Sequence, residues 1–148
     1  VRYAIDVLSG EANLEMEALL DGDVQNEDAN WEERFWEVVD KGGDAQGGHL
    51  LVKTRKTGFH VGHAFRASCA VDGQPVEAQT SPLEMGHALA FSCTASAGAS
   101  VLLDKQVGLV RDFDHDPDAL IAVAQQKAAE AEANGWNAAR QDHAMAWA

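Results

Sequence analysis

Residues 57–71, TGFHVGHAFRASCAV, form the longest stretch of the chain that alternates like a β-strand. One face of this strand would carry Phe59, Val61, His63, Phe65, Ala67 and Cys69, and the other His60, Ala64, Arg66 and Ser68. Asp72-Gly73 then indicates a tight turn into a short strand at residues 76–78. The segment therefore predicts a long strand within an antiparallel sheet.

Shorter segments on both sides repeat the two-residue period. Residues 3–7 alternate, and residues 14–20 place apolar side chains on one face and Glu15 and Glu17 on the other. Further strands are predicted at residues 35–39, 50–52, 89–93 and 100–109, with the glycines between the first two forming a flexible hairpin loop. About seven strands separated by Gly and Asp turns are typical of a mainly β, antiparallel sandwich.

The period changes once, near the C-terminus. Asp116 suits a helix N-cap and Pro117 the first helical position, and apolar residues then follow at helical spacing. Asn134-Gly135 predicts the end of this helix. A second helix is predicted over residues 138–147.

Composition and charge restrict the class of protein. The chain has 148 residues, 46% of them apolar, and a formal net charge of −13. Such acidity disfavours nucleic acid and anionic membranes as partners, because both attract cationic surfaces. The chain has no apolar run of 18 residues, so no membrane span is expected, and no secretion signal is visible. These features favour a cytoplasmic location.

The two cysteines leave one question open. Cys69 and Cys93 could pair across neighbouring strands, but both stand in apolar surroundings. Buried free thiols are the favoured interpretation, because two cysteines in a chain of this length do not form a disulfide scaffold.

Several groups of residues suggest a metal site or a catalytic site, but their positions in the sequence do not fit one. His60 and His63 lie three apart on a strand and therefore face opposite ways, so they cannot share a metal. The carboxylates at 112, 114 and 116 resemble a calcium loop, but Pro117 and Val123 replace its required Gly and Glu. Glu15 and Glu17 fit a solvated strand face better than a glycosidase pair. We therefore predict no catalytic, cofactor-binding or metal-binding residue, and no cofactor.

Four segments in order along the chain resemble the glycoside hydrolases and phosphorylases of family 65. They are LDGDVQN at 20–26, TRKTGF at 54–59, LDKQVGLV at 103–110, and the helical region containing Gly135-Trp136 and residues 143–147. Thr57 stands where Ser is commoner in the family. The family includes maltose, trehalose and kojibiose phosphorylases and acid trehalases.

The resemblance implies a fold and a place within a larger enzyme. Residues 1–113 would be the second half of a galactose-mutarotase-like super-sandwich, and residues 114–148 its C-terminal helix and the start of a linker helix. The remaining sandwich strands and a catalytic (α/α)₆ barrel would lie outside this chain. In the family the catalytic Glu and the phosphate-binding residues belong to that barrel, so none is expected here.

The implied function is therefore supportive. The domain would pack on the barrel, contribute to a homodimer and lie near the entrance for a disaccharide substrate and inorganic phosphate. The aromatic residues Trp31, Trp36, Trp136 and Trp147 are candidates for packing at such a junction. The alternatives are a self-standing carbohydrate-binding sandwich and an interaction module without a ligand.

Overall fold

The computed structural model describes residues 1–24 and 34–148. The described residues contain nine strands and one bent helix preceded by a 3₁₀ turn, η1 (Pro117–Ala119). The strands are β1 (Arg2–Asp6), β2 (Glu11–Asp21), β3 (Trp36–Asp44), β4 (Gly47–Thr54), β5 (His60–Val71), β6 (Gln74–Val76), β7 (Ala78–Leu83), β8 (Gly86–Ser96) and β9 (Ser100–Arg111), and the helix is α1 (Leu120–Ala146).

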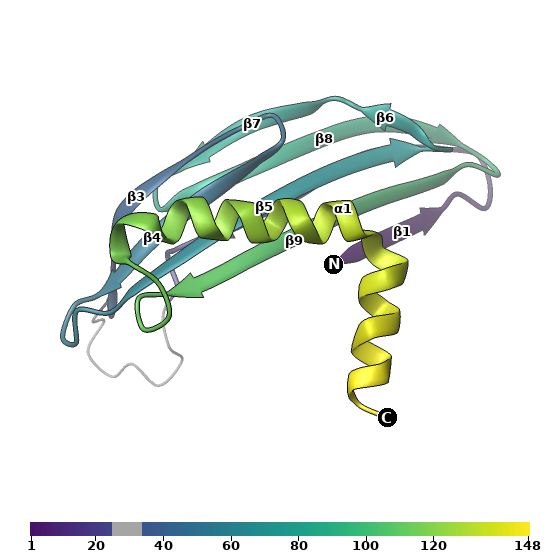
Figure 1. Ribbon diagram of the computed structural model, residues 1–148. Coiled ribbons are helices and arrows are strands. Elements are labelled where there is room, and N and C mark those ends of the chain that lie inside the picture. The colour runs from purple at the N-terminus through teal and green to yellow at the C-terminus, as the bar shows by residue number, and fades with distance from the viewer. Residues whose placement is uncertain (25–33) are drawn as a thin grey trace.

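The strands form two antiparallel sheets packed face to face, which confirms the predicted sandwich (Figure 1). The larger sheet has the order β1-β9-β5-β4-β3, with β6 added beside the end of β5. The smaller sheet has the order β2-β8-β7. Along the described strands, the chain crosses between the sheets four times, between β1 and β2, β2 and β3, β6 and β7, and β8 and β9.

The main core lies between the sheets. It contains Val7, Ala18, Phe65, Ala67, Cys69, Leu89, Phe91, Ala95 and Val101. The predicted alternation of β2 is confirmed, since Leu14 and Met16 pack against this core while Glu15 and Glu17 are exposed. The odd-numbered face predicted for the segment at 57–71 likewise supplies Phe65, and its strand begins at His60 rather than Thr57.

A second, smaller core lies on the opposite face of the larger sheet, under α1 (Figure 1). It contains Leu51, Ala64, Val110, Leu120, Ala124 and Ala128. Two glycines permit this close approach: a Cβ on Gly62 would lie 3.0 Å from Leu120 Cβ, and one on Gly108 would lie 2.1 Å from the Ala124 carbonyl oxygen. β5 and β9 are therefore covered on both faces.

The predicted hairpin between β3 and β4 is present, but the predicted flexible glycine loop is wrong. Gly42 pairs with His49, and Gly43 with Gly48, inside the ladder. The connection is only the turn Ala45-Gln46, where the Gln46 amide donates to Asp44 Oδ1 at 2.8 Å. Larger residues in place of Gly43 and Gly48 would collide with the ring of His87.

The cysteines are free thiols, as favoured by the sequence. They do not lie on neighbouring strands of one sheet, however, because Cys69 is on β5 and Cys93 on β8, in opposite sheets. Burial raises the pKa of the Cys69 thiol, which disfavours its reactive thiolate form.

Gly135 interrupts α1 with a sharp bend, at the position where the sequence predicts the end of the first helix. Its φ of 76° and ψ of 161° are not helical, and the residues after it lead away from the sheet (Figure 1). The second helical part therefore begins directly after Gly135, rather than at Ala138. None of the described helical segments has both the length and the apolarity needed to cross a membrane.

Candidate functional site

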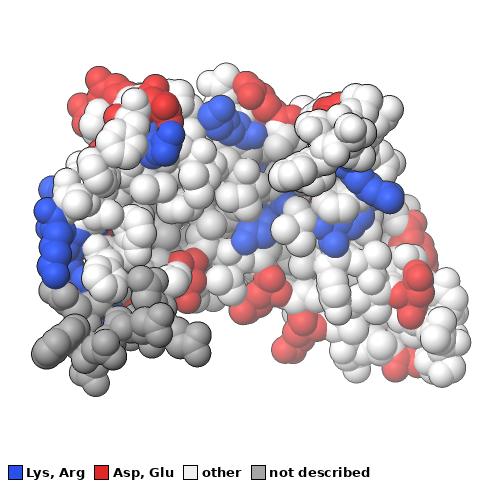
Figure 2. Space-filling view, turned by 90° about the horizontal axis from the view of Figure 1, so that it is seen from below, with Lys and Arg blue, Asp and Glu red and all other residues white. Residues whose placement is uncertain are grey.

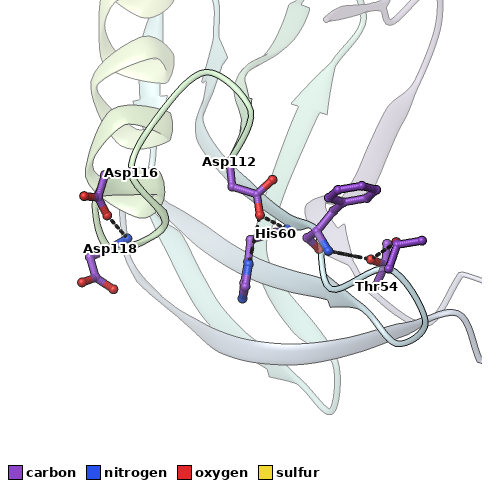
Figure 3. A network of polar contacts seen from close by, with 7 residues as sticks. Thr54, His60, Asp112, Asp116 and Asp118 are labelled. Atoms are coloured by element: carbon purple, nitrogen blue, oxygen red, sulfur yellow. Dashed lines mark hydrogen bonds and ion pairs between the residues drawn. The ribbon is translucent and has the colours of Figure 1, made fainter.

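Polar contacts gather at the end of the sandwich where β5 begins and β9 ends. The register that pairs Val61 with Arg111 places His60 beside Asp112. Asp112 Oδ2 accepts a hydrogen bond from the His60 amide at 2.7 Å and lies 3.1 Å from Nδ1 of the imidazole (Figure 3). One carboxylate oxygen thus fixes both the backbone and the ring of His60.

Asp112 is held in its charged form. The His60 amide that donates to it lowers the pKa of the Asp112 carboxyl, and the His60 ring adds to this effect. Its other oxygen, Oδ1, is buried without a hydrogen-bond partner among the described residues. The pair resembles the carboxylate–imidazole arrangement that orients a histidine in many sites.

The turn between β4 and β5 lies beside this pair and is tightly braced. Thr54 Oγ1 accepts from the Phe59 amide at 2.8 Å and lies 2.6 Å from Thr57 Oγ1. The Gly58 amide donates to the Thr54 carbonyl at 3.0 Å, and Gly58 has a φ of 73°, which favours glycine. This turn is the TRKTGF segment on which the family resemblance partly rests.

The loop after β9 lies on the other side of His60. Asp116 accepts a hydrogen bond from the Asp118 amide at 3.0 Å, which confirms its capping role, although a 3₁₀ turn precedes the α-helix (Figure 3). Asp114 pairs with Arg111 at 2.8 Å. The carboxylates at 112, 114 and 116 thus have separate partners and do not converge as a calcium site would require.

His63 lies on the opposite face of β5, as predicted. It lines an apolar pocket of about 350 Å³ between the sheets. Its other lining residues are Leu20, Asp21, Gly22, Val24, Trp36, Leu50, Val52, Val61 and Leu109. Burial lowers the pKa of His63, and its Nδ1 has no hydrogen-bond partner within the described ranges. The imidazole is therefore favoured in its neutral form.

A wider cleft of about 580 Å³ opens between the edges of β1 and β2. Lys105 extends from β9 into this space, donates to the Leu19 carbonyl and lies over the Phe65 ring, 5.3 Å from its centroid. Burial lowers the pKa of Lys105. Sequence reasoning missed this inward lysine, although its odd-numbered position between Leu103 and Val107 was a usable signal.

The described residues give no group of three or more His, Cys, Asp or Glu side chains that could hold a metal. Glu15 and Glu17 are exposed on β2. Trp36 reaches the pocket near His63, Trp136 contacts Arg2 and Trp147 is exposed, while Trp31 lies outside the described residues. Among the described residues, Asp112 orients the His60 imidazole, but the contacts do not assemble a triad of nucleophile, base and orienting group.

Comparison with known protein families shows to which family the chain is related. The profile of glycosyl hydrolase family 65, N-terminal domain, matches residues 1–148. The chain belongs to this family. As a family-65 N-terminal domain, it is 29% identical over 152 residues to maltose phosphorylase of Bacillus subtilis (strain 168), covering 99% of the chain and 19% of that protein.

The fold of this family-65 domain is also seen in a solved structure. A protein described as a kojibiose phosphorylase from the human microbiome matches 87% of the chain with a TM-score of 0.69. The sequence identity is 16%, and the match covers 16% of that protein. The family-65 domain thus corresponds to less than a fifth of each relative.

Proposed function

We propose that this chain is the noncatalytic N-terminal domain of an α-glucoside disaccharide phosphorylase or hydrolase. The observation that supports this most strongly is that the whole chain matches a family-65 N-terminal domain while spanning only 19% of a maltose phosphorylase. In this proposal, the domain supports the packing of a catalytic (α/α)₆ barrel, a homodimer and access of substrate. The proposal includes a cytoplasmic location, which the two free thiols support, because reducing compartments keep cysteines unpaired.

The open cleft between β1 and β2 would accept the remaining strands of a larger sandwich. Tyr3 at this opening is 59% exposed, and both strands are edges of their sheets. Edge strands offer unpaired backbone groups to further strands. Added strands here would also cover Lys105 and complete its surroundings.

The second part of α1 would contact the catalytic domain. It carries Met145 and Trp147, and Trp147 is 82% exposed. A large exposed aromatic residue on a helix leading away from the sheets is suited to packing against another domain.

The chemistry would take place in the other domain. There a carboxylic acid would protonate the leaving oxygen of a disaccharide while phosphate or water attacks with inversion at the anomeric carbon.

Activity assays test whether the reaction takes place in the other domain rather than in this chain. The isolated chain, incubated with maltose and phosphate, should release neither sugar phosphate nor free glucose above a protein-free blank. The same gene expressed with its downstream coding sequence should release sugar from maltose or a related disaccharide. Turnover by the isolated chain, abolished by a single carboxylate substitution within it, would overturn the proposal.

A further inference from the structure

The end of the sandwich that holds His60 carries two groups of opposite charge. Lys53, Arg55 and Lys56 lie at the turn between β4 and β5, and Asp116 and Asp118 lie in the loop after β9. In Figure 2, Lys and Arg side chains lie along the left edge, and Asp and Glu side chains lie toward the upper left. We call these five residues and the aromatic pair between them the loop-end surface.

The aromatic pair is Phe59 and Phe113. Their ring centroids lie 4.5 Å apart, yet Phe59 is 40% exposed and Phe113 is 63% exposed. Paired rings that remain open to water are typical of the centre of a protein–protein contact. The loop-end surface therefore has an apolar centre with a basic side and an acidic side.

The basic side is unusual in a chain with a net charge of −13. Arg2, Arg66 and Arg111 all pair with carboxylates. Across residues 1–24 and 34–148, by contrast, the side chains of Lys53 and Arg55 form no hydrogen bond or ion pair. These two cations are available to an acidic partner.

The surface is also preorganised. The bracing by Thr54 fixes the basic turn, and the contact of Asp112 with His60 ties the acidic loop to the same strand end (Figure 3). A surface that is already ordered loses less conformational entropy on binding.

We infer that the loop-end surface binds the loop-end surface of a second copy of this chain. A two-fold axis through the Phe59–Phe113 pair would bring each basic turn onto the acidic loop of the partner, because a two-fold interface pairs a surface with itself. Nucleic acid or an anionic membrane fits less well, since the acidic loop would repel phosphate groups next to the turn. This inference names the contact for the homodimer in the proposed function, and it rests on that proposal.

Charge-exchange variants of the full chain test the contact by sedimentation velocity over a range of concentrations and salt. Arg55→Glu and Asp118→Lys should each raise the dimer dissociation constant by about tenfold or more, because each places like charges opposite one another. The double variant should recover most of the wild-type affinity. Phe113→Ser should also weaken the dimer, and the change in the dissociation constant should be the same at low and high salt. Lys127→Glu on the exposed side of α1 makes the same charge change elsewhere and should have no effect.

Two results would overturn the loop-end contact while leaving the proposed function standing. A dimer with the same affinity in wild type, Arg55→Glu and Phe113→Ser would overturn the loop-end contact while keeping the homodimer. A wild-type chain that stays monomeric at about 1 mM would also overturn the loop-end contact, because such weak association is below that of a specific interface. The homodimer of the proposed enzyme would still be able to form through its catalytic domain. Circular dichroism of each variant confirms that a change in association does not reflect unfolding.

Discussion

His87 occupies the space that a side chain on Gly48 would need. A Cβ built on Gly48 would lie 2.6 Å from Cδ2 of the His87 ring, and one on Gly43 would lie 2.4 Å from its Nε2. The ring is only 5% exposed, and its Nε2 has no hydrogen-bond partner in the part of the chain that the structure describes. The glycines of β3 and β4 thus accommodate a buried histidine from the facing sheet.

Gly48→Ala should lower the free energy of unfolding by about 1–3 kcal/mol, as expected when an atom is forced into a filled core. Urea unfolding measures this loss. In a His87→Ala background the same change should cost less, because the ring that blocks the new methyl group is gone. Equal costs in both backgrounds would show that the ring is not the obstacle.

Stability should fall as the pH drops through the range in which histidine titrates. Burial lowers the pKa of both His63 and His87 below the ordinary 6.5. The unfolded chain therefore binds protons first, so the contribution is complete above pH 6.5 and is lost as the pH falls from there toward the folded pKa values. The slope from each histidine is at most about 1.4 kcal/mol per pH unit.

Unfolding free energies measured between about pH 5 and pH 8 check this histidine dependence, a window that lies above the carboxyl range. A variant with His63→Gln and His87→Gln should show a flatter profile. If its profile parallels that of the wild type, other groups cause the acid sensitivity.

Leu120 should be the main anchor of the helix on the sheet. It is 0% exposed and lies against Gly62. Leu120→Ala should cost about 2–5 kcal/mol in unfolding free energy. Leu109→Ala is the matched control, because Leu109 is 59% exposed, and it should change stability by less than about 0.5 kcal/mol. Similar losses in the two variants would contradict this role.

Gly135→Ala should straighten α1. The backbone at Gly135 has φ 76° and ψ 161°, a region that only glycine adopts readily. Spin labels at Lys127 and Asp142, in a chain with both cysteines changed to Ala, should then separate to about 22 Å, the span of 15 residues in a straight helix. A label distance equal to that of the bent parent would mean that packing, rather than glycine, fixes the bend.

The local patterns in the sequence were sufficient to locate most elements. Alternation along residues 14–20 and the Asp116 cap depend on neighbours a few positions away, so both could be read directly. The strand pattern predicted the antiparallel sandwich, and the family model confirmed the resemblance.

Contacts between distant segments could not be read in this way. Gly48 lies within a strand because of His87, which follows 39 positions later and belongs to the other sheet. The His60–Asp112 contact spans 52 positions and depends on the pairing of β5 with β9. The assignment of Cys69 and Cys93 to opposite sheets likewise required the topology.

The position of β5 and β9 between two cores has a consequence for how the family can vary in length. Odd-numbered residues such as Phe65 face the smaller sheet, and even-numbered residues such as Ala64 face the helix. A single inserted residue would exchange these two sets at once and place large side chains such as Phe65 under the helix, where Gly62 and Gly108 now permit a close approach. Relatives should therefore keep these two strands free of insertions and deletions, and should accumulate them at the exposed turns.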